Sequence, residues 1–155
     1  MRWDWRNVPL PEPHLGGLAA GIALQWMTPL AIPAPALVRI VGALLVLSGL
    51  VVAIWAVHAA ADEHLAHSRH LVVTGPYAIA RHPMYVGWTA GYLGVAAMTG
   101  NGWLLLLLPA VLLITHRAVL REERTLQARF GEDYRRYARA VGRYGPRRST
   151  AARNS

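Results

Sequence analysis

The sequence predicts an all-α protein, an integral membrane bundle of four transmembrane helices followed by a cytoplasmic, helical C-terminal segment. Two observations lead to this prediction. The 155 residues are 54% hydrophobic and only 15% charged, whereas a soluble domain usually carries about 25% charged residues. The apolar residues also gather in blocks that contain very few charges, as the interior of a lipid bilayer requires. The length suits a single domain over residues 1–155.

Each apolar block defines one expected span. A helix needs about 20 residues to cross roughly 30 Å of hydrocarbon, so the first, third and fourth blocks are short and need flanking residues or local bilayer thinning. The fourth helix is expected to continue past the membrane to about Phe130, where Gly131 interrupts it. The expected spans cover residues 15–30, 37–61, 84–98 and 103–116.

The connections between these spans place the polar residues at one end of the bundle. Residues 31–36 contain two prolines and residues 99–102 contain two glycines, so both connections are short turns without room for a site. The link over residues 62–83 is longer and polar. It lies on the same side as the tail, residues 117–155, so a site at this end would meet both water and lipid.

Charge predicts the orientation of the protein in the membrane. All sixteen basic residues are arginine, and eleven of them lie from Arg117 onward against four acidic residues, a local net charge of +7. A basic segment that follows a span is attracted to anionic lipid and retained in the cytoplasm, so we expect membrane lipid rather than nucleic acid as its partner. We therefore expect a protein of the bacterial inner membrane with its N-terminus, the 62–83 link and the tail in the cytoplasm. Because the chain has no cysteine, disulfides, thiolate nucleophiles and cysteine-based zinc sites are excluded.

The first group of candidate functional residues lies in the stretch 75–87. Its Gly-Pro pair marks a turn, and Pro83 suits the first turn of the third span. A helix N-terminus presents free N–H groups, which suit a carboxylate or another anion. The arginine, histidine and tyrosines at this end are equally typical of an interfacial cap that anchors a helix.

A second group lies at the foot of the fourth span, where Glu122 and Glu123 follow Arg117 and Arg121. Adjacent acids beside the hydrocarbon are unfavourable unless they are paired or functional. A carboxylate directed into the bundle would bind a cation such as an ammonium group. The structural alternative is a solvated helix turn with several ion pairs.

Two further patterns carry less information. Tyr134 and Tyr137 share one helical face, where they either cover a cofactor or lie at the membrane interface. A series of histidines would suggest a metal site, but only two acidic residues stand beside it, and a metal site needs a defined ligand geometry. We therefore expect no metal. The histidines are His58, His64, His67 and His70.

Four motifs occur in order along residues 65–146, about half of the chain, with a hydrophobic hairpin between the second and the third. Together they resemble the superfamily of isoprenylcysteine carboxyl methyltransferases and phospholipid methyltransferases. The motifs read Gly75-Pro76-Tyr77, Arg81-His82-Pro83-Met84-Tyr85-Val86-Gly87, Glu122-Glu123-Arg124-Thr125-Leu126 and Phe130-Gly131-Glu132-Asp133-Tyr134-Arg135-Arg136-Tyr137.

The resemblance implies a membrane enzyme that uses S-adenosylmethionine to methylate a lipid-like or isoprenoid-like small substrate. A helix N-terminus suits the methionine carboxylate of this cofactor, and a glutamate suits its ammonium group. The cofactor-binding residues that the resemblance implies are Arg69, His70, Leu71, Val72, Tyr77, His82, Pro83, Met84, Tyr85 and Glu122.

The catalytic candidates depend on the methyl acceptor. Arg117 or Arg121 would orient a carboxylate, and Glu123 would act as the base for an amine or a thiol. Carboxyl methyltransferases carry a substrate-linked arginine close to the position of Ala118, so carboxylate, amine, thiol and lipid headgroup all remain open as acceptors. Two alternatives remain: a membrane reductase that uses NADPH, and a non-enzymatic membrane bundle.

The oligomeric state also remains open. Small residues in the second and third spans pack helices closely, either within one chain or between chains. They include Gly42, Ser48, Gly49, Gly87, Gly91 and Gly94.

Overall fold

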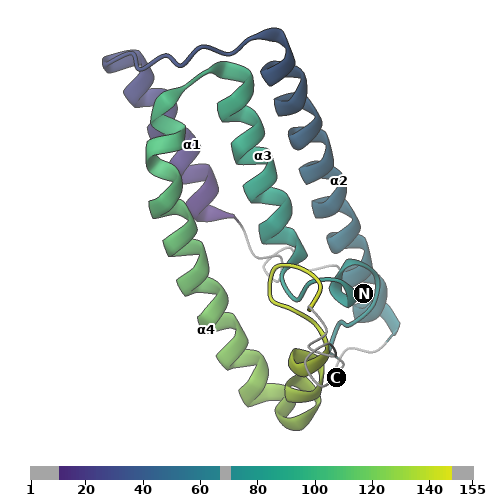
Figure 1. The fold of residues 1–155 in the computed structure, drawn as a ribbon. Helices are drawn as coiled ribbons and strands as arrows, with labels where there is room; N and C mark the ends of the chain where they lie inside the picture. The colour runs from purple at the N-terminus through teal and green to yellow at the C-terminus, as the bar shows by residue number, and fades with distance from the viewer. Residues whose placement is uncertain (1–10, 67–70, 148–155) are drawn as a thin grey trace, which may run out of the picture.

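The computed structural model describes residues 11–66 and 71–147, without the side chains of residues 62–66. This part of the chain is helical and contains no β-strand, which confirms the all-α prediction. The helices run up and down beside one another (Figure 1). They are α1 (Glu12–Met27), α2 (Ala36–Ala66), the 3₁₀ helix η2 (Gly75–Ala78), α3 (Pro83–Thr99) and α4 (Gly102–Ala140).

Two of these helices are long and apolar enough to cross a membrane. They are α2 over Ala36–Ala61, with a mean hydropathy of 2.7, and α4, whose most apolar stretch has a mean hydropathy of 2.0. Only 22% of each apolar stretch is buried, which differs from the mostly buried core helix of a soluble protein. The helices α1 and α3 have 16 and 17 residues. At about 1.5 Å per residue they are shorter than roughly 30 Å of hydrocarbon, so four complete spans are not established.

The two short connections pair with each other at one end of the bundle (Figure 1). The N–H of Ile32 donates to the carbonyl of Gly100 at 2.8 Å, and the N–H of Gly102 donates to the carbonyl of Leu30 at 2.8 Å. Gly100 has a φ of 62°, and a Cβ atom there would meet the carbonyl oxygen of Ile32. Hydrogen bonds between the two connections therefore tie the helices together at this end of the bundle, and the polar segments lie at the opposite end.

Glycines let α2 and α3 pack backbone against backbone. A Cβ atom on Gly42 would lie 2.8 Å from the carbonyl oxygen of Gly94, and one on Gly87 would lie 2.7 Å from that of Gly49. Such small-residue contacts are typical of helices that associate in membranes. Four of the small residues noted in the sequence therefore pack helices within one chain.

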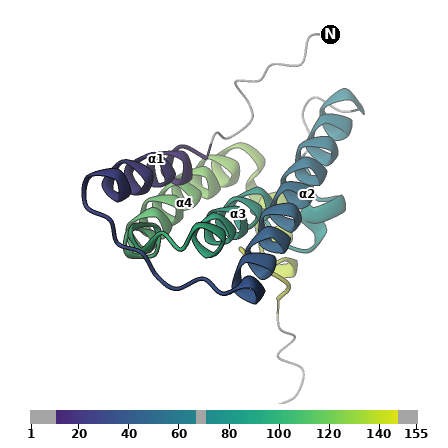
Figure 2. The ribbon, with the colours of Figure 1, turned by 90° about the horizontal axis from the view of Figure 1, so that it is seen from above.

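A second contact joins α1, α3 and α4. Seen from above, α1 lies beside α4, while α3 lies between α4 and α2 (Figure 2). The core here contains Tyr92, Ala96, Leu104 and Val111. Tyr92 is fully buried, and its hydroxyl donates to the carbonyl of Leu104 at 3.0 Å, which satisfies the buried polar atom.

The last helix bends back on itself at Gly131. This residue has φ 53° and ψ −119°, which is not helical, so α4 consists of one arm before it and one arm after it. The break confirms the sequence prediction. The second arm turns toward η2 and the start of α3 (Figure 1).

Candidate functional site

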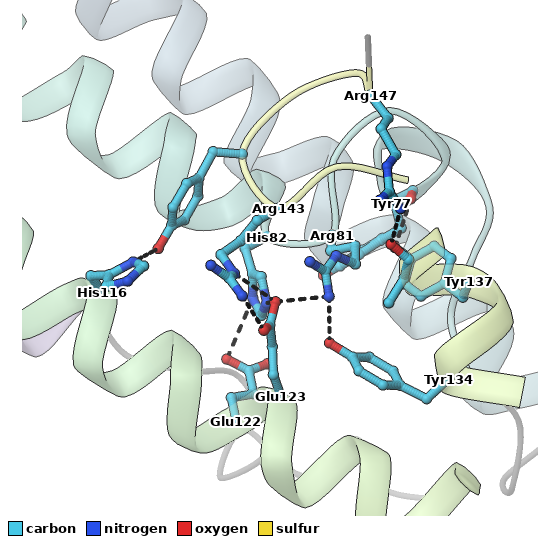
Figure 3. A network of polar contacts seen from close by, with 12 residues as sticks. Tyr77, Arg81, His82, His116, Glu122, Glu123, Tyr134, Tyr137, Arg143 and Arg147 are labelled. Atoms are coloured by element: carbon cyan, nitrogen blue, oxygen red, sulfur yellow. Dashed lines mark hydrogen bonds and ion pairs between the residues drawn. The ribbon is translucent and has the colours of Figure 1, made fainter. Parts of the chain in front are cut away.

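The start of α3 meets the foot of α4 and the C-terminal segment, residues 141–147, at the polar end of the bundle (Figure 3). The N–H of Arg81 donates to the carbonyl of Gly142 at 2.9 Å, and the N–H of His82 donates to the carbonyl of Arg143 at 3.1 Å. The hydroxyl of Tyr137 donates to the carbonyl of Tyr77 at 2.7 Å. The C-terminal segment and the second arm of α4 therefore hold the loop that precedes α3.

Glu123 is the centre of an ion-pair network. It lies 2.9 Å from Nη1 of Arg81, and Arg143 donates to both carboxylate oxygens, at 2.9 and 2.7 Å. The same Nη1 of Arg81 donates to the hydroxyl of Tyr134 at 3.0 Å. Burial favours a higher pKa for Glu123, but hydrogen bonding from Arg143 and the charges of both arginines hold the pKa below its usual range. A carboxylate held in this way is a weak base.

His82 lies between the two glutamates and is buried. Burial lowers its pKa to about 4 and outweighs the opposing effect of Glu123, so the ring is neutral at pH 7. Its Nε2 lies 3.3 Å from Oε1 of Glu123, so we infer that Nε2 carries the hydrogen. The other ring nitrogen, Nδ1, is then an acceptor, 3.7 Å from Oε2 of Glu122.

Glu122 differs from its neighbour in having no cationic partner. Its side chain is 38% exposed, and within the part of the chain that the structure describes no arginine lies at ion-pair distance from it. Burial and the charge of Glu123 raise its pKa, against a hydrogen bond from Tyr85. Burial and the charge of Glu122 likewise raise the pKa of Tyr77 to about 12. A tyrosine and a neutral histidine therefore lie beside an unpaired carboxylate, and the pKa of a second tyrosine responds to its charge.

The N-terminus of α3 opens beside this carboxylate. Its N-cap residue is His82, no side chain caps it among the described residues, and Pro83 at the first position has no N–H to satisfy. The following residues, Met84 and Tyr85, are buried. A helix N-terminus of this kind offers N–H groups and partial positive charge to an anion.

A groove of about 520 Å³ lies between α1, α3 and α4. Tyr85 lines this groove and lies close enough to Glu122 to lower the pKa of its carboxyl, so the groove adjoins the unpaired carboxylate. Arg117 and Arg121, one helical turn apart, line it from α4, and neither forms an ion pair with another described residue. The other lining residues are Glu12, Pro13, Ile114 and Ala118.

The remaining predicted residues are distributed as follows. Leu71 and Val72 are half-buried just before η2. Arg69 and His70 lie outside the described residues. Within the described part of the chain, no three potential metal ligands group together.

Sequence reasoning missed the functional position of the C-terminal segment. The hydroxyl of Tyr144 is hydrogen-bonded with Nδ1 of His116 at 2.8 Å, and the Tyr144 ring lies 6.5 Å from the ring of His82. With Arg143 on Glu123, this segment closes one side of the site. Its residues lie at the end of the stretch 65–146 over which the resemblance extends, where Val141-Gly142-Arg143 departs from the Val-Pro-Arg of bacterial relatives, but nothing in their spacing indicates contacts with α4 or with the start of α3.

Two curated relatives match about half of this chain. The nickel-cobalt-cadmium resistance protein NccN of Alcaligenes xylosoxydans xylosoxydans is 38% identical over 82 residues, which cover 53% of this chain and 38% of NccN. The cobalt-zinc-cadmium resistance protein CzcN of Cupriavidus metallidurans is 39% identical over 80 residues, or 51% of this chain and 37% of CzcN. The matched part is thus less than two fifths of either relative. No solved structure matches the chain.

The family match extends further than these pairwise matches. The model of a family described as phospholipid methyltransferase matches residues 37–133, from the start of α2 to just beyond the break in α4. That range includes His82, Tyr85 and both glutamates, and it confirms the resemblance found in the sequence. Because the match covers more than half of the sequence, the chain belongs to the phospholipid methyltransferase family.

Proposed function

We propose that the protein is a membrane methyltransferase that transfers a methyl group from S-adenosylmethionine to a lipid-like acceptor. Family membership implies methyl transfer. The choice of S-adenosylmethionine as the cofactor rests on one observation, which is that two adjacent acids differ in their ion pairing. Glu123 is neutralised by Arg81 and Arg143, whereas Glu122 has a raised pKa and no cationic partner among the described residues. An unpaired carboxylate of this kind suits a ligand that brings its own cation.

The residues around Glu122 fit the amino-acid part of this cofactor. Glu122 and the Nδ1 acceptor of His82 would accept hydrogen bonds from its ammonium group. The uncapped N-terminus of α3 would take its carboxylate. Tyr77 and Tyr85 would flank the rest of the cofactor, together with Leu71 and Val72. Arg69 and His70 remain proposed contributors from the preceding link.

The adjoining groove would hold the acceptor. Bound S-adenosylmethionine would supply an electrophilic methyl group, which the acceptor nucleophile takes as the carbon–sulfur bond breaks and its electron pair stays on sulfur. Arg117 and Arg121 would orient an anionic group of the acceptor, and the groove would align it and exclude water. Glu123 would position Arg81, Arg143 and His82 rather than act as a base, because its pKa is lowered.

The proposed orientation of the protein in the membrane follows from the positive charge at the polar end of the bundle. The arginine-rich foot of α4 and the C-terminal segment would lie on the cytoplasmic side of a bacterial inner membrane, as positively charged flanks do. A soluble cofactor would then enter from the cytoplasm. A lipid-like acceptor would enter from the bilayer, where Ile114 at the groove is 53% exposed.

Calorimetry of S-adenosylhomocysteine binding to the purified protein in detergent tests the proposal. The wild type and the exposed control Glu132→Gln should bind alike, and Glu122→Gln should bind at least about tenfold more weakly, because a hydrogen bond to a charged group is lost. Circular dichroism should show the same helix content in all three. Absence of binding in folded wild type, or equal binding by Glu122→Gln, would overturn the cofactor assignment. Binding of NADPH instead would favour a reductase.

A further inference from the structure

The bend of α4 at Gly131 creates a second hollow, which we call the elbow pocket. It has a volume of about 360 Å³ and lies inside the angle between the two arms of α4. Leu120 and Arg124 line it from the first arm, and Arg135 and Arg139 line it from the second. The proposed methyl transfer uses none of the arginines that line this pocket from the two arms of α4.

Charge in the elbow pocket is strongly unbalanced. Five arginines and one glutamate line it, and that glutamate, Glu123, is already paired with Arg81 and with Arg143, which lies outside the pocket. Arg124 forms no ion pair with another described residue. An excess of positive charge gathered in one concave surface attracts an anion.

Two further cations of the pocket, Arg135 and Arg139, are held only weakly by a neighbouring acid. Arg135 and Arg139 both pair with Glu132, at 3.0 and 2.8 Å, but all three side chains are more than half exposed. Exposed pairs of this kind contribute little and exchange readily for a better anion. Arg147 closes the pocket from the C-terminal segment, where its Nη1 donates to the carbonyl of Ala138 at 2.9 Å and also contacts that of Arg139.

We propose that the elbow pocket binds a phosphate group. The guanidinium groups of arginine form paired hydrogen bonds with phosphate oxygens, and three arginines from two helical arms converge here on one volume. S-adenosylmethionine does not suit this pocket, since its sulfonium and ammonium groups give it a net positive charge. The elbow pocket is therefore distinct from the site at Glu122, and its occupation does not depend on methyl transfer.

The position of the pocket relative to the membrane suggests a lipid headgroup as the source of the phosphate. Leu120 and Arg124 lie four and eight residues beyond His116, where the apolar stretch ends. At about 1.5 Å per residue these positions are roughly 6 and 12 Å farther along the helix, and the headgroup layer is roughly 5–8 Å thick on each side. Leu120 thus lies at the level of lipid phosphates and Arg124 a few ångströms beyond it, although a free phosphate offers the same chemistry.

A matched pair of double variants in the full chain tests the proposal. Arg124→Gln with Arg135→Gln removes two charges from the pocket, and Arg129→Gln with Arg136→Gln removes two exposed charges from the same helix outside it. Detergent-solubilised protein is titrated with short-chain phosphatidylglycerol, with inorganic phosphate and, as a zwitterionic reference, with short-chain phosphatidylcholine. The pocket variant should bind at least about tenfold more weakly than wild type, and the outer variant should bind as wild type does.

Each outcome is decisive. Binding of phosphatidylglycerol but not of inorganic phosphate, lost only in the pocket variant, supports a lipid headgroup as the ligand. Binding of inorganic phosphate with the same dependence supports a free phosphate. Equal weakening in both double variants, or no anion binding by folded wild type, overturns the proposal. S-adenosylhomocysteine binding, measured on the same samples, reports independently on the site at Glu122.

Discussion

Arg143 and Glu123 lie 20 residues apart in the chain, yet they form a bidentate pair, with Nε to Oε1 at 2.9 Å and Nη2 to Oε2 at 2.7 Å. This pair fastens the C-terminal segment to the foot of α4. It also neutralises one of two adjacent acids, while the other, Glu122, has no arginine at ion-pair distance among the described residues. Because Arg81 holds the same carboxylate at 2.9 Å, the pair ties the start of α3 into the same unit.

Replacement of Arg143 by glutamine should loosen the C-terminal segment. The variant loses hydrogen bonds to a charged partner, which contribute about 1.5–3 kcal/mol to the stability of the fold. The loss of stability is not larger because Arg81 still pairs with Glu123. Thermal unfolding in detergent should therefore start at a lower temperature, and limited proteolysis should cut the tail sooner. The exposed Arg136→Gln serves as the control for charge. Wild-type behaviour of Arg143→Gln in both assays would contradict the structural role given to the pair.

Much of this architecture is predictable because it depends on local sequence. Apolar blocks predict helices, and the break at Gly131 follows from a glycine between two helical patterns. The number of membrane spans is harder to predict from sequence. The helices α1 and α3 have only 16 and 17 residues, and whether a helix of this length crosses the membrane depends on the thickness of the bilayer as well as on the helix.

The division of roles between Glu122 and Glu123 was less accessible to sequence reasoning. The sequence predicts that one of them meets a cation, and the resemblance selects Glu122, but the partners of Glu123 come from residues 41 positions earlier and 20 positions later. Contacts over such separations leave no periodic signal. For the same reason the contact between Tyr144 and His116 is visible only in the folded chain.

The stability of the protein should fall as the pH is lowered from about 6.5 to about 4. Burial lowers the pKa of His82 to about 4, so in this window the unfolded chain takes up a proton that the folded chain resists. A shift of this size corresponds to about 3–4 kcal/mol at most. Arg81, Arg143, Glu122 and Glu123 all face the ring. At lower pH the loss of the Glu123 carboxylate, whose pKa is lowered, adds to the effect, whereas Glu122, whose pKa is raised, takes up a proton more readily in the folded chain and offsets part of it.

The variant His82→Gln isolates this contribution, since glutamine keeps a donor toward Glu123 and does not titrate. Unfolding midpoints between pH 4 and 7 should depend less on pH in this variant than in wild type. Replacing the exposed His58 by glutamine should leave the pH dependence unchanged. If His82→Gln follows the wild-type profile, the neutral, buried state assigned to this ring is wrong.

The double variant Arg117→Gln with Arg121→Gln should impair methyl transfer to the acceptor but not binding of the cofactor. Both arginines line the groove, and neither contacts another described acid, so their loss leaves the fold and the site at Glu122 intact. With a bacterial lipid extract as acceptor, transfer of a labelled methyl group should fall at least about tenfold. Affinity for S-adenosylhomocysteine should stay as in wild type. Undiminished transfer would remove these residues from the acceptor site.

The glycine contacts between α2 and α3 can be tested within one helix. A Cβ atom on Gly94 would lie 2.5 Å from the carbonyl oxygen of Gly42 and 2.7 Å from Cγ2 of Val46, so Gly94→Ala must push the helices apart. Overpacking of this kind destabilises by about 1–3 kcal/mol. A Cβ atom on Gly91 meets nothing within 4 Å, and Gly91→Ala should be neutral or stabilising by up to about 1 kcal/mol. Equal melting temperatures for the two variants would contradict the close packing.

Gly131 should tolerate no side chain, although it has free space around it. No atom lies within 4 Å of a Cβ built there, yet its φ of 53° with ψ of −119° is a backbone conformation that residues with a Cβ atom rarely adopt. Gly131→Ala should therefore destabilise by about 1–3 kcal/mol through backbone strain alone. Gly145→Ala, which also has open space and no positive φ, should have little effect. The bend also forms the elbow pocket, so Gly131→Ala should weaken phosphatidylglycerol binding as well as stability. If the variant keeps wild-type stability and wild-type phosphatidylglycerol binding, the arms of α4 do not need this bend.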